Sequence, residues 1–136
     1  MKKILALLLL LITVITVTGC DSGDFKYINR YSAVGMLRSN TKDSCRLSFQ
    51  SLDGQIVYKL KYTKAAEGCI FYEASIKEGE LNIYYDVFGA KEHLFMAQAG
   101  YPIEGEGGYI EGGKTVYVII EAADAKDGTV EIWLGR

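Results

Sequence analysis

Five side chains in the middle of the chain are spaced so that together they could bind a ligand. Alternating stretches at 70–76 and 81–87 flank Glu78-Gly79, which we take as the turn of an antiparallel hairpin. One face of that hairpin is apolar, and the other places three rings within aromatic reach of one another across the strands. The rings and the two carboxylates beside them are Phe71, Tyr84, Phe88, Glu73 and Asp86.

An aromatic stripe with nearby carboxylates suits two kinds of ligand. Many β-sandwich modules hold sugars on flat rings beside carboxylates, and the same surface suits a peptide or protein. The alternative is that another segment covers the stripe and makes it a second layer of core. Trp133 alternates away from its apolar neighbours, so it is a further candidate for binding, or else for packing under a loop.

Motifs for catalysis or metal binding are absent from the sequence. The single histidine, His93, lies in an apolar stretch, and no GxSxG, HExxH or paired CxxC pattern occurs. We therefore expect a protein that is not an enzyme and that holds no cofactor or metal. One enzymatic alternative stays open, because Glu73 and Asp86 share a face and would suit glycan hydrolysis by a carboxylate pair.

The Gly-rich stretch at 100–113 is expected to be an acidic loop. It lacks the GxGxxG spacing and the strand–helix context of a nucleotide-binding loop. Glu104, Glu106 and Glu111 would offer oxygen ligands to Ca²⁺, and the alternative is that they are simply solvated.

The alternation along the chain predicts one domain built from short antiparallel strands. Asp53-Gly54 is a two-residue hairpin signal, and pairing about it sets apolar residues at 45–49 opposite apolar residues at 58–62. The whole domain is expected to have about seven or eight strands and no helix beyond the N-terminal signal, so the predicted fold class is an all-β antiparallel sandwich or small barrel. The expected core contains Leu47, Phe49, Tyr58, Leu60, Ile70, Ile83, Tyr85, Val118 and Ile120.

Two cysteines of the domain, Cys45 and Cys69, are candidates for a disulfide or for two separate thiols. A bridge would close a loop of roughly 25 residues and stabilise by roughly 3 kcal/mol. If a third strand lay between theirs, two strand spacings of about 9.6 Å would be too far for a bridge. In the hairpin register Cys69 also falls on the outer side.

The N-terminus carries an address. Lys2-Lys3 precede an apolar run of 14 residues from Ile4 to Val17, within the roughly 7–15 of a signal peptide and short of the roughly 20 of a spanning helix. Val17-Thr18-Gly19-Cys20 follows. This stretch resembles the signal peptide and lipobox of bacterial lipoproteins, over residues 1–20 only. The resemblance implies a signal at 1–19 and palmitate and further acyl chains on Cys20. A tether at 20–24 would then lead to the single β-sandwich domain, which the strand pattern predicts at 25–136.

Charge and address together limit the partners. Loss of Lys2 and Lys3 leaves 13 basic against 17 acidic residues, a net charge of about −4. This balance argues against nucleic acid, and it suggests that lipid, rather than electrostatic docking, holds the protein at the membrane. We therefore predict a lipid-anchored cell-envelope protein, at the cell membrane or outer membrane, with its domain on the extracytoplasmic side. Its function would be non-catalytic recognition of an envelope glycan or protein partner. The alternatives are a secreted glycan-active enzyme and a purely structural envelope lipoprotein.

Overall fold

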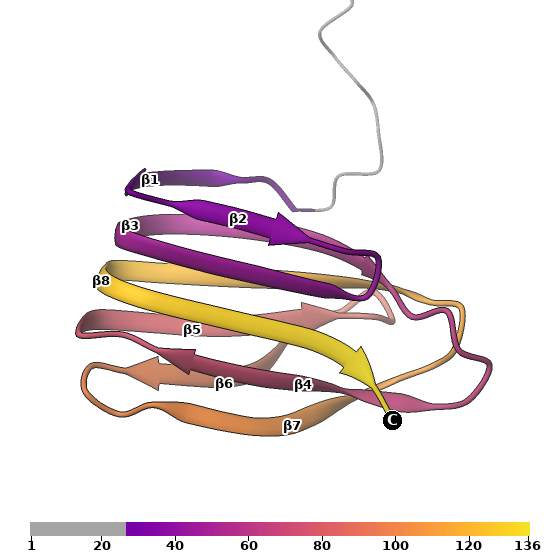
Figure 1. Ribbon diagram of the computed structural model, residues 1–136. Helices are drawn as coiled ribbons and strands as arrows, with labels where there is room; N and C mark the ends of the chain where they lie inside the picture. The colour runs from indigo at the N-terminus through magenta and orange to yellow at the C-terminus, as the bar shows by residue number, and fades with distance from the viewer. Residues whose placement is uncertain (1–26) are drawn as a thin grey trace, which may run out of the picture.

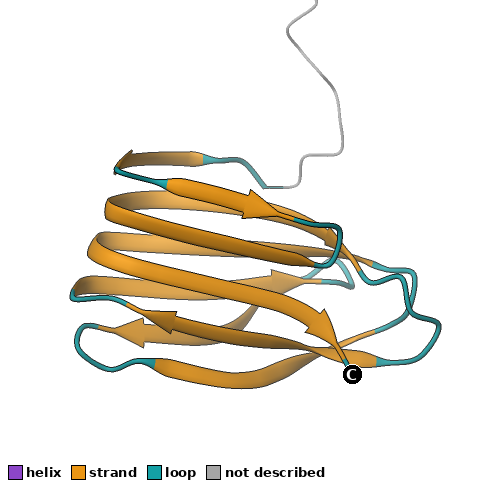
Figure 2. Ribbon diagram, viewed as in Figure 1, coloured by secondary structure: helices purple, strands orange, loops and turns teal. Residues whose placement is uncertain are grey.

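Antiparallel strands make up most of the computed structural model, which describes residues 27–136 (Figure 2). The predicted signal peptide, its helix, Cys20 and the tether lie outside these residues. Within residues 27–136 no helix is long and apolar enough to cross a membrane. The eight strands are β1 (Arg30–Val34), β2 (Leu37–Asn40), β3 (Ser44–Lys61), β4 (Gly68–Ser75), β5 (Glu78–Asp86), β6 (Glu92–Gln98), β7 (Ile103–Ile110) and β8 (Thr115–Gly135).

Two long strands run through both layers of the fold (Figure 1). β3 and β8 pair along almost their whole length and bend together, so each contributes one half to each layer. The front layer consists of β2, the first half of β3, the second half of β8, β4 and β7. The back layer consists of the second half of β3, the first half of β8, β5 and β6. β1 pairs with β3 around the bend.

The bend lies at Asp53-Gly54 in β3 and at residues 123–127 in β8. Gly54 has a φ of +112°, and a Cβ there would lie 2.3 Å from the Arg30 carbonyl oxygen, so only glycine fits. Asp124 and Asp127 also take positive φ, and the Asp124 amide donates to Asp53 Oδ1 at 3.0 Å. Turn residues therefore fold two paired strands over together.

The hairpin predicted at Asp53-Gly54 is wrong as a pairing. β3 continues through this pair and stays bonded to β8 on both sides of it. The predicted faces are nevertheless those that are buried, because the two halves of β3 face each other across the core. Alternation about a turn is the same whether two segments lie side by side or face to face.

The hairpin predicted at Glu78-Gly79 is wrong for the same reason. β4 pairs with β7 and β8, whereas β5 pairs with β6 and the other half of β8. Residues 76–79 therefore carry the chain from the front layer to the back layer. The apolar faces of both strands again point into the core between the layers.

The predicted core and fold class are confirmed. Eight of the nine expected residues are buried, and Tyr85 packs against the core while staying partly exposed. One segment differs from its prediction, because most of the stretch at 100–113 is the strand β7 rather than a loop. Its pairing with β4 satisfies backbone groups that the loop interpretation left to water.

No disulfide joins the two cysteines of the domain. Cys45 and Cys69 are free, and β8 lies between their strands. Cys45 points into the core, whereas Cys69 lies on the outer side, where its Sγ donates to Glu106 at 3.7 Å. The structure therefore has a third strand between the two cysteines, which is the arrangement expected to rule out a bridge.

Candidate binding groove on the front layer

The predicted stripe of three rings does not form, because β4 and β5 lie in different layers. Phe71 is on the outer face of the front layer and stacks on Trp133, with ring centroids 5.8 Å apart and planes inclined by 11°. Tyr84 is on the back layer and meets His93 edge to face at 5.2 Å. Phe88 follows β5 and stacks on a tyrosine of β7 at 6.2 Å.

The predicted carboxylate pair is also separated. Asp86 is 2% exposed at the end of β5, where it accepts hydrogen bonds from Tyr27 Oη at 2.6 Å and from the Gly89 amide at 2.8 Å. Burial, reinforced by the Asp86 carboxylate, raises the pKa of Tyr27 to about 12. Glu73 lies on the outer face of the opposite layer. Asp86 thus ties Tyr27, the first described residue, to the back layer and has no access to Glu73.

A row of charged side chains crosses the front layer instead. Successive cross-strand partners are directly opposite one another, with Glu104 paired to Glu73, Glu73 to Glu131, and Glu131 to Arg46. Directly opposite residues have Cβ atoms about 4.5–5.5 Å apart. We call this set the acidic row: Glu104, Glu73, Glu131 and Arg46.

The acidic row holds three carboxylates and one cation. Arg46 Nη2 donates to Glu131 Oε2 at 2.8 Å, and this hydrogen bond is the main reason that the pKa of Glu131 is lowered. Glu73 and Glu104 face one another as like charges, an arrangement that is ordinarily destabilising. The row therefore presents more hydrogen-bond acceptors and more negative charge than its single guanidinium matches.

Two further rows lie on either side of the acidic row. Two residues along the strands, Phe71 and Trp133 are directly opposite each other and form the ring stack described above. In the other direction, Ser75 lies opposite Thr129, with their hydroxyl oxygens 3.3 Å apart, and Thr129 lies opposite Ser48. Rings, carboxylates and hydroxyls thus follow one another in register on a single face.

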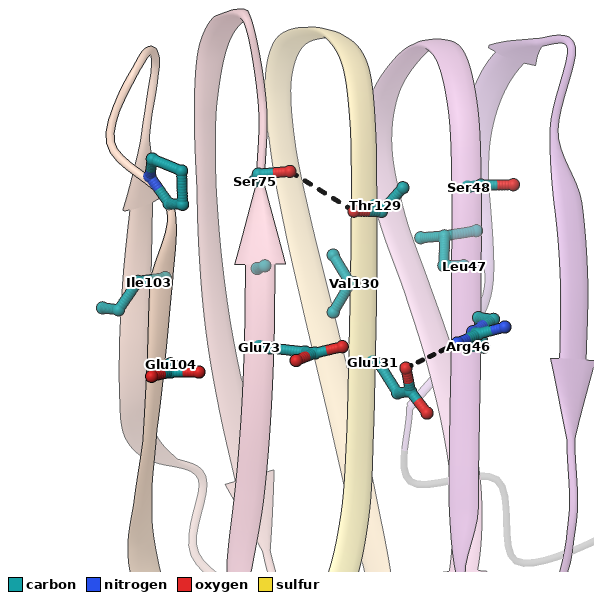
Figure 3. Close-up of a pocket in the computed structure, with 12 residues that line it drawn as sticks. Arg46, Leu47, Ser48, Glu73, Ser75, Ile103, Glu104, Thr129, Val130 and Glu131 are labelled. Atoms are coloured by element: carbon teal, nitrogen blue, oxygen red, sulfur yellow. Dashed lines mark hydrogen bonds and ion pairs between the residues drawn. The ribbon is translucent and has the colours of Figure 1, made fainter.

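The acidic and hydroxyl rows line an open groove of about 640 Å³ that crosses four strands (Figure 3). Pro102 and Ile103 form its border at β7, and Arg46 and Ser48 border it at β3. A smaller hollow of about 230 Å³ shares Arg46 and Glu131 and continues the polar surface towards β2. The groove therefore offers an elongated polar track with one apolar border.

The remaining candidates do not come together as a site. Glu104 and Glu106 are on strand β7 and Glu111 follows it, and within residues 27–136 no three His, Cys, Asp or Glu side chains are grouped to hold a metal ion. His93 Nε2 lies 3.3 Å from Asn82 Oδ1, beside the ring of Tyr84, which is a structural environment.

Of the predicted binding residues, the structure brings Glu73, Phe71 and Trp133 together. It adds Arg46 and Glu131, which the sequence did not single out, and Glu104, which the sequence offered only as a Ca²⁺ ligand. The alternation that exposes Trp133 also exposes Glu131, so that signal was present. The pairing of β8 with β4 places Glu131 opposite Glu73. Alternation along a strand does not reveal which strands pair.

No protein-family model matches the chain, and neither does any curated protein sequence. Among solved structures, a galactotriose complex of TmCBM61 matches with a TM-score of 0.48 and 12% identity, covering 79% of this chain and 87% of that one. The C-terminal CBM6 of LamC, a laminarinase of Zobellia galactanivorans, matches at 0.41 and 8%, covering 79% and 93%. The Drosophila melanogaster CENP-C cupin domain matches at 0.34 and 13%, covering 74% and 71%. At these scores the similarities do not place the chain in any of these families.

Proposed function

We propose that this domain is a non-catalytic recognition module that binds an envelope glycan in the groove of the front layer, while lipid on Cys20 holds it at the membrane. The observation that supports the proposal is the register of three rows, with stacked rings, carboxylates and hydroxyls side by side on one open face. A sugar presents the complementary chemistry, since its ring has an apolar face and its rim carries hydroxyls.

Each row has a separate task in this proposal. Glu73, Glu104 and Glu131 accept hydrogen bonds from sugar hydroxyls, and bonds to ionised acceptors are roughly twice as strong as neutral ones. Arg46 donates to ring or hydroxyl oxygens. Phe71 and Trp133, two residues along the strands from the acidic row, offer apolar surface next to the groove. The four strands of the groove span about 14 Å, which is enough for an oligosaccharide rather than a single sugar.

The charge of the groove narrows the ligand class. Three carboxylates against one guanidinium repel acidic glycans and favour neutral or amino-bearing ones. The same count makes a nucleic-acid backbone an unsuitable ligand. We therefore expect neutral and amino-sugar oligomers to bind, and uronic-acid oligomers to bind less.

The exposure of the groove carboxylates favours recognition over hydrolysis. Glu73 and Glu104 are exposed, whereas a carboxyl that acts as general acid near neutral pH sits in an apolar, water-poor environment. Asp86, the other member of the predicted pair, is buried in the other layer. Glu73 does lie directly between two other carboxylates, so a hydrolysis assay belongs in the test.

Calorimetry of the detergent-solubilised protein with neutral, amino-bearing and acidic oligosaccharides tests the function. Glu73→Gln should weaken binding at least several-fold, because it removes a central acceptor of the groove. Glu78→Gln is the matched control, since Glu78 is exposed at the start of β5 outside the groove. Equal affinity of both variants for every oligosaccharide, or cleavage of a glycan that stops in Glu73→Gln, would contradict the proposal.

Labelling with a palmitate analogue tests the anchor separately. The natural protein should take up label and float with membranes, and Cys20→Ala should do neither. Cys69→Ser is the matched control, because it removes a partly exposed thiol while leaving the lipobox intact. Uptake of label by Cys20→Ala would disprove lipidation at this residue.

A further inference from the structure

The edge formed by β1 and β2 gathers the exposed aliphatic side chains of the described chain. Among residues 27–136, eight large hydrophobic side chains are exposed, and five of them are aromatic. The three aliphatic ones all lie between residues 28 and 37, with Leu37 as the most exposed at 74%. The exposed hydrophobic residues of this edge are Ile28, Tyr31, Val34 and Leu37. Clusters of this kind mark interaction surfaces.

The same edge is basic, although the chain as a whole is acidic. Among residues 27–42 of the described chain three are basic and none is acidic, against a net charge of −2 for the whole sequence. Arg30 lies in β1 and is exposed, and Lys42 lies just after β2 and is exposed. Arg38 packs over the rings of Tyr31 and Tyr58, at 5.9 Å and 4.7 Å, and so braces this edge.

The opposite edge of the front layer has the reverse charge. β7, the last strand in the order that begins with β1, carries Glu104 and Glu106 and no basic residue. Figure 1 shows β1 and β2 at one end of both layers and β6 and β7 at the other. The domain is therefore polarised across its strands, with a basic apolar edge and an acidic edge.

The described chain begins at Tyr27, three residues before β1, with its hydroxyl group bonded to Asp86 of the back layer. Six residues separate Cys20 from Tyr27, the first residue described. A fully extended chain of this length spans about 25 Å. The carbonyl oxygen of Ile28, which follows Tyr27, accepts from Gln55 Nε2 at 2.9 Å, and Gln55 lies on β3 opposite Arg30 of β1. A lipid on Cys20 would thus keep the edge within a short distance of the bilayer.

We propose that the β1–β2 edge rests on the surface of the bilayer, inserting Val34 and Leu37 among anionic lipid headgroups and standing the two layers on this edge, so that the groove opens parallel to the membrane. This inference rests on the lipid anchor of the proposed function. Apolar side chains flanked by cations bind anionic interfaces by partial insertion and charge attraction. The acidic edge at β7 is repelled by the same surface, so the charge of both edges favours one orientation. The net charge alone had predicted no such docking, because it averages two opposite edges.

Depth-dependent quenching tests this orientation on the full-length lipidated protein in phosphatidylcholine vesicles with and without phosphatidylglycerol. A bimane label is placed at Leu37→Cys or, as matched control, at Tyr101→Cys, which is 73% exposed between β6 and β7. Both carry Cys69→Ser, so that no other accessible thiol of the described chain reacts. Spin-labelled lipid should quench the label at 37 several-fold more than that at 101. Adding Arg30→Glu should lower the quenching at 37 in anionic vesicles alone.

The outcomes separate this inference from the proposals it rests on. If the protein takes up palmitate label but the labels at 37 and 101 are quenched equally, the edge contact is disproved and the anchor stands. If the protein floats with vesicles and the label at 37 is quenched without any palmitate labelling, the edge contact stands and the lipid anchor is disproved. Absence of flotation overturns both, and excimer formation between pyrene labels at 37 on two chains would show that a second copy, rather than lipid, covers the edge. Each of these results is independent of glycan affinity in the groove.

Discussion

The outer faces of the two layers use similar residues in opposite ways. On the back layer, Lys91 pairs with Glu121 and lies 4.2 Å from the Tyr84 ring, so its charged and aromatic groups partner one another. On the front layer, three carboxylates share one guanidinium. The back face is matched internally, whereas the front face keeps acceptors for something else. Imbalance, rather than the mere presence of rings and charges, is what distinguishes a candidate site here.

The largest expected effect tests whether the two faces share one core. Leu47 is fully buried beneath the groove, and Leu47→Ala should lower the free energy of unfolding by about 2–5 kcal/mol. Leu37→Ala, at an exposed position, should change it by less than about 0.5 kcal/mol. Denaturant unfolding followed by Trp133 fluorescence and by far-UV circular dichroism measures both. Two transitions in place of one would mean that the layers unfold separately.

The next effect contrasts the rings of the two faces. Trp133→Ala should weaken glycan binding by about 2–10-fold, the equivalent of the roughly 0.5–1.5 kcal/mol of an aromatic contact. Tyr84→Ala on the back layer should leave the affinity unchanged. Calorimetry with the tightest-binding oligosaccharide measures both variants. If Tyr84→Ala lost as much affinity as Trp133→Ala, the ligand would not be confined to the front face.

The sequence predicts which side chains face the core, but not which strands lie side by side. Alternation identified Phe49 and Tyr58 as sharing the core, and both are buried. It could not show that their segments lie in different layers, because side-by-side and face-to-face strands have the same mirror pattern about a turn. The predicted partner of Phe71 was therefore a ring of β5, whereas its actual partner, Trp133, lies 62 residues away along the chain. A site built across strands depends on strand order, which local pattern does not determine.

A third prediction is that replacing Glu by Gln changes the free energy of unfolding in opposite directions on the two faces. Glu73→Gln relieves like-charge contacts and should raise the free energy of unfolding by about 0.2–1 kcal/mol. Glu121→Gln on the back layer breaks an ion pair with Lys91 and should lower it by up to about 1 kcal/mol. Thermal unfolding at low ionic strength compares them. A gain of stability in Glu73→Gln together with weaker glycan binding would be the trade-off expected of a binding residue. Loss of stability in both variants would contradict the imbalance.

The smallest effect concerns the one ion pair of the groove. Arg46 holds the pKa of Glu131 below its usual range. A carboxyl whose pKa is depressed on folding stabilises the protein at neutral pH, and this contribution is lost as pH falls through the usual glutamate range towards the lowered value. Arg46→Gln should therefore make stability less dependent on pH on the acid side while leaving the pH dependence in the neutral range unchanged.

Salt provides the internal control for that prediction. The Glu131 pair is close to solvent, so added salt should reduce the acid-side difference between Arg46→Gln and the natural protein. Unfolding by urea at a series of pH values, at low and high ionic strength, measures the difference. Unaltered acid sensitivity in Arg46→Gln would show that Arg46 does not set the ionisation of Glu131. Arg46 is the only cation among the described residues that line the groove. If it did not stabilise the ionised form of Glu131, another interaction would have to offset the repulsion among the three carboxylates of the acidic row.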